Sequence, residues 1–188
     1  MNTLYPIFVK ADQLQFLIVG GGFVALEKLE FLFKSSPNAQ VTLVAPFIRE
    51  ETLAFIQNKS VKIIVKKYRR RFLRNKHIVV ATTDVHEVNL KVHSDCQKRN
   101  LLVNVADTSD LCDFYMGGIV TKGNLKIAIS TNGKSPTVAK RLRQWLEAVL
   151  PNEIDDLLET LRQYRKTLKG DFDYKVKAMN EVTKNLIK

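Results

Sequence analysis

The sequence of 188 residues is poor in cysteine, proline and glycine, and it has no long apolar run. Its two cysteines, Cys96 and Cys112, are too few for a disulfide-stabilised scaffold, so a reducing compartment is expected. Eight glycines and five prolines argue against a fibrous or disordered chain. No apolar stretch approaches the roughly 20 residues that span a bilayer, and the start of the sequence lacks the apolar core of a signal peptide. We therefore expect a cytoplasmic protein with no membrane partner.

Acidic residues are also scarce, with 19 Asp and Glu against 30 Lys and Arg, for a net charge of +11. The excess is concentrated between Lys59 and Lys76, where half of the residues are basic and none is acidic. Basic residues interleaved with Tyr68 and Phe72 could bind nucleic acid, because cations meet phosphates and aromatic rings stack on bases. No nucleic-acid recognition motif accompanies them. The pattern favours a solvated basic turn after a strand, and we expect no nucleic-acid partner.

Up to about residue 106, short β-branched runs alternate with helical patterns, which predicts an α/β fold with a Rossmann-like parallel sheet. The predicted strands are Phe16–Val19, Val41–Ala45, Val61–Val65, His77–Thr82 and Leu101–Ala106. They are continuous apolar runs, typical of strands covered on both faces. Helices are predicted over residues 23–34 and 85–98. In the first helix a stripe at helical spacing is predicted to be buried, formed by Ala25, Leu29, Leu32 and Phe33.

The pattern changes in the second part of the chain. The short turn Lys122-Gly123-Asn124 separates two apolar runs, residues 115–121 and 125–131, which predicts a β-hairpin. Ser135-Pro136 supplies an N-cap followed by proline at the first helical position, so a helix is predicted through Leu150. The remaining residues have helical spacing, with a break at Gly170.

Three regions are therefore expected: a Rossmann domain at residues 1–112, a dimerisation region of hairpin and helix at 113–150, and a C-terminal helical domain at 151–188. Fewer than 80 residues follow the nucleotide-fold half, and their apolar faces have little of their own chain to cover them. A homodimer is the expected assembly.

The strongest motif is a glycine turn, in which the apolar run Phe16–Val19 leads into Gly20-Gly21-Gly22-Phe23-Val24-Ala25. This G-x-G-x-x-A pattern is typical of a dinucleotide-binding turn, because its glycines allow a tight turn and a close approach of the backbone to a pyrophosphate. An acid that would bind the adenosine ribose is missing after the second strand, where Arg49 could instead meet a 2′-phosphate. The residues alone leave NAD and NADP open.

A second motif, Asn132-Gly133-Lys134-Ser135, looks like the end of a P-loop. The full pattern needs a glycine where Ala128 stands, so a P-loop is not expected. The segment still precedes a helix N-terminus, and Lys134 beside it could bind a carboxylate or phosphate.

Taken in order, several elements make the sequence resemble precorrin-2 dehydrogenase, the dehydrogenase/ferrochelatase module of sirohaem synthase. They are Tyr5-Pro6-Ile7-Phe8, the glycine turn with Lys28, Ala81-Thr82-Thr83-Asp84 with Asn89, Asn104-Val105 with Asp107, and Ser130–Pro136 with Ala139. The resemblance runs from about Leu4 to Pro151. It departs at Phe23, where the family often has a polar residue, and at Arg69–Arg71, which replace a commonly acidic stretch.

The resemblance implies oxidation of precorrin-2 to sirohydrochlorin with NAD⁺ as hydride acceptor, followed in some members by insertion of Fe²⁺ to give sirohaem. It implies a homodimer and a tetrapyrrole substrate. It also assigns site residues: Asp107 as catalytic; Gly20, Gly21, Gly22, Phe23, Val24, Ala45, Pro46, Phe47, Thr82, Thr83 and Asp84 toward NAD; and Asn104, Lys134, Ser135, Lys140 and Arg141 toward the substrate.

Asp107 also fits on chemical grounds, because dehydrogenation releases a proton and metal insertion releases two, and a carboxylate can accept them. It is predicted just past the carboxyl end of the fifth strand, on the side where open α/β sheets bind ligands. Asp110 and Asp113 are nearby alternatives. His86, His93 and Cys96 could share a helix face, but such spacing is common by chance and no resident metal site is expected.

A second class of function stays open at this point. A non-catalytic NAD(H)-sensing Rossmann module could regulate a dimer, and the basic segment from Lys59 to Lys76 favours it. The lack of a recognisable DNA-binding helix pair disfavours it.

Overall fold

The chain folds into two compact units, and the computed structural model describes residues 2–185. The first unit extends to Met116 and includes Asn132–Lys134, and the second holds Gly117–Thr131 and the chain from Ser135 onward. The expected division at residues 112 and 150 into three functional regions stays a prediction.

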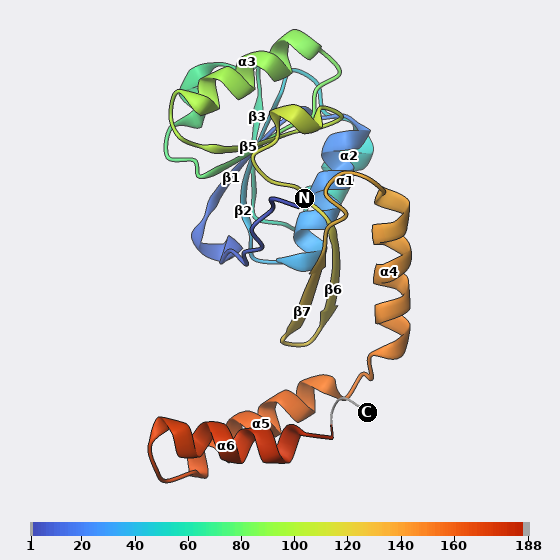
Figure 1. Cartoon of the computed structure of the whole chain (residues 1–188). Coiled ribbons are helices and arrows are strands. Elements are labelled where there is room, and N and C mark those ends of the chain that lie inside the picture. The colour runs from blue at the N-terminus through green and yellow to red at the C-terminus, as the bar shows by residue number, and fades with distance from the viewer. Residues whose placement is uncertain (1, 186–188) are drawn as a thin grey trace. The chain divides into compact units, whose positions relative to one another are not determined.

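A five-stranded parallel sheet forms the centre of the first unit, in the order β3-β2-β1-β4-β5 (Figure 1). Its strands are β1 (Gln15–Val19), β2 (Gln40–Ala45), β3 (Val61–Val65), β4 (Ile78–Ala81) and β5 (Leu102–Val105). All five predicted strands are confirmed to within a residue or two at their ends. The strand order reverses between β1 and β4, and this switch point is where open α/β sheets bind ligands. The predicted Rossmann-like fold is confirmed.

Helices cover both faces of this sheet (Figure 1). Successive side chains of β1 point to opposite faces, so this strand contributes to two cores. On one face Phe16 and Ile18 join a core with α1 (Phe23–Ser35), and the predicted stripe of Ala25, Leu29, Leu32 and Phe33 is buried. On the other face Leu17 and Val19 pack with Val92 and Cys96 of α3 (His86–Gln97). Truncating a buried leucine of either core would cost about 2–5 kcal/mol.

Two expectations for the first unit were wrong or incomplete. β3 is an edge strand and is not covered on both faces, since Ile63 is 41% and Val65 64% exposed. The sequence pattern also missed α2 (Glu50–Ile56), a seven-residue helix whose N-cap, Arg49, makes no capping side-chain hydrogen bond. The short 3₁₀ turns η1 (Ala11–Gln13), η2 (Arg70–Leu73) and η3 (Ser109–Leu111) complete this unit.

The second unit contains the predicted hairpin and three helices. The antiparallel pair β6 (Gly118–Lys122) and β7 (Leu125–Ile129) packs against α4 (Pro136–Val149). Ser135 caps α4 as predicted, because its Oγ accepts a hydrogen bond from the Val138 N–H at 3.3 Å. The hairpin α5 (Ile154–Thr167) and α6 (Phe172–Thr183) follows, and Gly170 at φ +145° lies in the predicted break.

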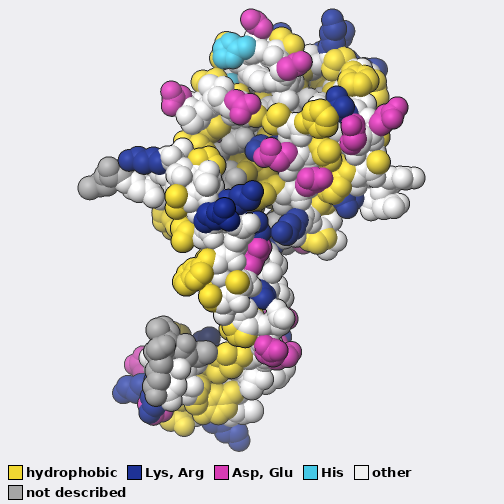
Figure 2. Space-filling view, turned by 90° about the vertical axis from the view of Figure 1, so that its right-hand side faces the viewer, with side chains coloured by type: hydrophobic (Ala, Val, Ile, Leu, Met, Phe, Trp, Pro, Cys, Tyr) yellow, Lys and Arg dark blue, Asp and Glu magenta, His cyan; other side chains and the backbone are white. Residues whose placement is uncertain are grey.

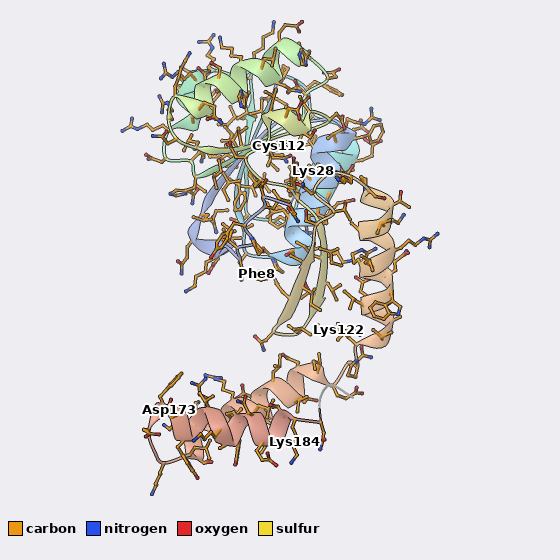
Figure 3. All side chains as sticks on the ribbon, viewed as in Figure 1. Phe8, Lys28, Cys112, Lys122, Asp173 and Lys184 are labelled. Carbon is orange, nitrogen blue, oxygen red and sulfur yellow. The ribbon has the colours of Figure 1, made fainter. Side chains whose placement is uncertain are left out.

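The turn of the β-hairpin is tied to the start of the helical tail within this second unit. Lys122 Nζ donates to Asn152 Oδ1 at 2.6 Å (Figure 3). Asp155 Oδ1 accepts from the backbone N–H of Asn124 at 2.7 Å and from its side chain at 2.9 Å, and these bonds lower the pKa of Asp155. Within residues 2–185 no helix has the length and apolarity that crossing a membrane requires.

Candidate functional site

The glycine turn lies at the carboxyl end of β1, against the end of β4. Gly20 has φ +126°, a conformation that side chains rarely adopt. A Cβ built on it would lie 2.4 Å from Thr82 Oγ1, which itself donates to the Val19 carbonyl at 3.0 Å. Gly20 is therefore required both by its backbone angle and by the approach of Thr82.

Gly21 is enclosed by the loop that follows β2. A Cβ there would lie 2.3 Å from the Phe47 carbonyl oxygen, and the Arg49 N–H donates to the Gly21 carbonyl at 3.0 Å. Thr52 Oγ1 makes a second, longer bond to the same carbonyl at 3.4 Å. The predicted cofactor residues Ala45, Pro46 and Phe47 thus lie beside the turn, and Phe47 is 71% exposed.

Gly22 differs from both, because a Cβ built on it meets no atom within 4 Å. It is the N-cap of α1, so the first N–H groups of that helix, from Phe23 and Val24 onward, have no partner inside the helix. Open space in front of a helix N-terminus is what a pyrophosphate needs. The site therefore fits the dinucleotide that the sequence predicts.

Arg49 is positioned beside this opening by two contacts that the sequence did not reveal. Its guanidinium carbon lies 3.8 Å from the centre of the Phe23 ring, and its Nη2 is 3.1 Å from Glu51 Oε1. The hydrogen bonds from Arg49 lower the pKa of the Glu51 carboxyl. Phe23, the position at which the sequence departs from its family, thus serves as a platform for a cation.

The loop after β4 contributes Thr82, Thr83 and Asp84, and Asn89 holds it. The Asn89 side chain is buried, accepts from the Thr83 N–H at 3.2 Å and from Thr83 Oγ1 at 2.8 Å, and donates to the Thr83 carbonyl at 2.8 Å. Asn89 is in α3, and sequence reasoning gave it no role in the site. The only signal was its place in the family pattern.

Asp107 lies just after β5, as predicted, and its side chain is exposed. Its φ of +61° places it in the left-handed region, and the preceding residue, Ala106, donates its N–H to the Ala81 carbonyl at 2.9 Å. Non-glycine residues in this conformation are uncommon and gather at functional sites. Because the Asp107 side chain is exposed, only a bound ligand or another part of the protein could shield its carboxylate from water.

Hydrogen bonds of Cys112 and Asn104 hold the loop that carries Asp107. The Cys112 thiol donates to the Val105 carbonyl at 3.2 Å and accepts from the Val105 N–H at 3.3 Å. Burial raises the pKa of this thiol, and the charge of Lys28 opposes the shift (Figure 3). The buried Asn104 amide donates to the Phe114 carbonyl at 2.9 Å and so helps to hold the loop. Its contact with the substrate stays a prediction.

Of the alternative carboxylates, that of Asp113 already accepts hydrogen bonds from other residues of the chain. Its Oδ2 accepts the Val103 N–H at 2.9 Å, and Gln97 donates to both of its oxygens. Asp110 is exposed on η3, where Ser109 Oγ lies 3.5 Å from its carboxylate. Asp107 is therefore the better candidate for chemistry, although its role stays a prediction.

The remaining predicted substrate residues belong to a different part of the chain. Lys134 is counted with the first unit and is exposed, whereas Ser135, Lys140 and Arg141 belong to the second. Lys140 and Arg141 are exposed on α4, where Arg141 bonds Gln144 at 3.2 Å. Within residues 2–185 no three His, Cys, Asp or Glu side chains gather as a metal site, and Cys96 is fully buried.

Comparisons with known proteins fit this geometry. The family described as "Putative NAD(P)-binding" matches residues 7–118, and the family described as "Sirohaem biosynthesis protein central" matches residues 122–148. A siroheme synthase from Psychrobacter arcticus is 37% identical over 170 residues, which cover 90% of this chain and 30% of that protein. One from Pseudoalteromonas translucida is 36% identical over 169 residues, covering 90% and 35%. The chain thus spans about a third of the length of these curated relatives.

Among solved structures, SirC, a precorrin-2 dehydrogenase, superposes with a TM-score of 0.73 at 23% identity. The match covers 95% of this chain and 89% of SirC. At this identity the likeness establishes the fold.

Proposed function

The chain belongs to this NAD(P)-binding family, and from that premise we propose that it oxidises precorrin-2 to sirohydrochlorin with NAD⁺ as hydride acceptor. The observation that carries the proposal is the sequence of groups along one edge of the sheet. The open Gly22 follows β1, Thr82–Asp84 follow β4, and Asp107 follows β5, on three adjacent strands beside the switch point. The printed names of the relatives, siroheme synthase and precorrin-2 dehydrogenase, support the choice of substrate.

The reaction asks two things of this edge. The bound dinucleotide accepts one hydride from a ring carbon of the substrate, giving NADH, and a proton must leave in the same two-electron oxidation. Asp107 is exposed, lies on a loop that backbone and side-chain hydrogen bonds hold, and makes none of the backbone bonds that occupy Asp113. We assign it the proton, since a general base must reach the substrate from a fixed position.

The experiment is an assay of purified protein with precorrin-2 and NAD⁺, following sirohydrochlorin. Asp107→Ala is expected to abolish turnover while NAD⁺ still binds, because the glycine turn is untouched. Asp110→Ala, which removes an exposed carboxylate three residues away, is the matched control and should keep wild-type turnover. Wild-type turnover by Asp107→Ala would contradict the assignment. Turnover with NADP⁺ in the same assay tests the role of Arg49.

Iron insertion is the second arm of this assay. Placing Fe²⁺ in sirohydrochlorin releases two pyrrole protons, and Asp107 is available for that task as well. Incubation with sirohydrochlorin and Fe²⁺ or Co²⁺ distinguishes a dedicated dehydrogenase from a bifunctional enzyme.

Lys134, Lys140 and Arg141 are proposed to meet substrate carboxylates, which their exposure supports. The two free thiols, Cys96 and Cys112, support a cytoplasmic location.

We further propose that the protein is a homodimer through α4. Val138, Leu142, Trp145 and Val149 recur on one helix face and are 48%, 42%, 59% and 52% exposed, while a neighbouring side of the helix packs on the hairpin through Ala139. Figure 2 shows that hydrophobic side chains lie exposed between charged ones on the face of the molecule that it displays. Trp145→Glu should give a monomer in sedimentation, whereas Lys140→Glu on the exposed polar face should not. A wild-type monomer at micromolar concentration would contradict the dimer.

A further inference from the structure

The basic segment found in the sequence contributes to a pocket at the amino ends of the strands. This amino-edge pocket has a volume of about 720 Å³ and is lined by the residues that precede or begin β1, β2, β3 and β4. Gln15 and Gln40 lie at the starts of β1 and β2. Four cations also line it: Lys59, Lys62, Arg74 and Lys76. Its volume lies within the roughly 300–1,000 Å³ of small-molecule sites.

The positive charge of this pocket is not compensated by the protein. No acidic residue is among those that line it. Across the described residues 2–185, none of its four cations forms an ion pair with a carboxylate. Lys59 instead lies over two aromatic rings, 4.5 Å from the centre of Phe55 and 5.5 Å from that of Phe33.

Lys76 shows the cost of this arrangement. It is half-buried, and burial together with the charge of Lys62 lowers its pKa. A protein that only needed solubility would place these charges apart, because like charges that face one another without counter-charges disfavour the folded state. An anion bound between Lys62 and Lys76 would offset their repulsion and compensate for the burial of the Lys76 ammonium group.

The pocket is separate from the glycine turn. β1 has five residues and joins Gln15 in the pocket to Val19 beside Gly20, so the two places lie about 16 Å apart along the strand. The pocket also crosses from β3 to β4, a distance of three strand spacings or about 14 Å. A ligand that engages both ends must carry more than one anionic group.

We propose that the amino-edge pocket binds a small polyanion with two or more phosphate or carboxylate groups, at a site distinct from that of the dinucleotide. Arg74 supplies a fork of N–H donors that suits either group, and the lysines act as point charges. The basic segment that looked like a solvated turn in the sequence thereby gains a specific ligand class.

The test is calorimetric titration of the full chain, at low salt, with pyrophosphate, with citrate, and with orthophosphate as a ligand of lower charge. Pyrophosphate or citrate should bind with one-to-one stoichiometry and orthophosphate at least about tenfold more weakly, since each added charge meets another cation. Preference between pyrophosphate and citrate identifies phosphate or carboxylate as the native chemistry. Saturating NAD⁺ should leave the titration unchanged.

Matched variants separate the pocket from general charge. Lys62→Gln with Lys76→Gln should weaken binding by about tenfold or more, whereas Lys66→Gln with Lys67→Gln, exposed lysines that do not line the pocket, should change it less than twofold. Arg74→Gln replaces another cation that lines the pocket, at an exposed position. It should also weaken binding, without disturbing the folded protein. Equal losses in the paired variants, competition by NAD⁺, or no saturable binding at millimolar concentration would overturn the proposal.

Discussion

The two edges of the parallel sheet present opposite means of holding an anion. At the carboxyl edge the recognition elements are mainly backbone: an open glycine, a helix N-terminus and loops fixed by buried hydrogen bonds, with the Arg49 side chain beside them. At the amino edge they are four cationic side chains around a pocket. Backbone groups hold a ligand by shape and hydrogen bonds and do not titrate, whereas lysine side chains hold it mainly by full charges that salt screens more strongly. The difference teaches that the net charge of +11 need not describe the coenzyme site at all.

The largest effect is expected from a charge placed in the carboxyl edge. Gly22→Asp should weaken NAD⁺ binding on the order of 100-fold, because its carboxylate would repel a pyrophosphate bound in front of the helix N-terminus. Aspartate is a favourable N-cap, so the free energy of unfolding should hardly fall. Gly22→Asn, which fills the same space without charge, is the control and should lose less. Calorimetry with NAD⁺ and thermal unfolding measure the two quantities, and equal losses would refute the electrostatic reason.

The next effect concerns the support of that edge. Asn89→Ala leaves the Thr83 N–H and carbonyl without their buried partner and should lower the free energy of unfolding by about 2 kcal/mol. It should also raise the KM for NAD⁺, since the loop after β4 is released. Asn58→Ala, at an exposed turn, is expected to change neither. Urea unfolding with an unchanged midpoint in Asn89→Ala would show that the loop is held by other contacts.

Salt should separate the two edges directly. Between about 50 and 500 mM salt the Debye length falls to a few ångströms, so pyrophosphate binding at the amino edge should weaken about tenfold or more. Binding of NAD⁺ to backbone groups should weaken less than about threefold. Titrations of the same preparation at several salt concentrations give both slopes. Similar slopes would mean that side-chain charge also dominates the coenzyme site.

The smallest effect is on the pH dependence of the free energy of unfolding, to which Cys96 in the buried core and Lys76 at the amino edge contribute with opposite sign. Burial raises the pKa of the Cys96 thiol from 9.0 to about 12, so above pH 9 the unfolded chain ionises first and stability falls as the pH rises toward 12. The loss should be about 1 kcal/mol between pH 9 and 10. Lys76 acts in the opposite sense, because its lowered pKa makes the folded state gain as it deprotonates.

Two variants resolve these opposing contributions. Cys96→Ala should flatten the alkaline decline, after correction for the cavity that it leaves. Lys76→Gln should steepen the decline, because the gain from the amino edge is removed. Chemical unfolding at pH 8, 9 and 10 measures each slope, and a decline in Cys96→Ala as steep as that of the wild type would refute the thiol as its source.

Much of the fold could be predicted because its signals are local. The apolar runs, the stripe through Ala25 and Leu29, and the cap at Ser135 each arise from residues within two helical turns of one another. α2 escaped because seven residues with no capping side chain give too short a periodic pattern. The exposure of β3 escaped because an apolar run does not reveal whether its strand is central or at an edge.

The site divides in the same way. Gly20 and Gly22 were predictable because their steric roles follow from the turn itself. Asn89 was not, because its residue type does not reveal that the side chain turns back onto Thr83, six residues earlier. The platform of Phe23 under Arg49 was not, since it needs the loop after β2 to lie beside the start of α1. The amino-edge pocket is the extreme case, because its cations gather only when the start of β3 and the start of β4 share one edge.

The left-handed backbone at Asp107 restricts which amino acids can occupy that position at all. At φ +61° aspartate, asparagine and glycine are tolerated, whereas β-branched side chains are strained. A library randomised at this codon and selected only for folded protein should therefore return these three residues. The same library selected for sirohydrochlorin formation should return aspartate alone. The gap between the two selections would measure how much of the position is architecture and how much is chemistry.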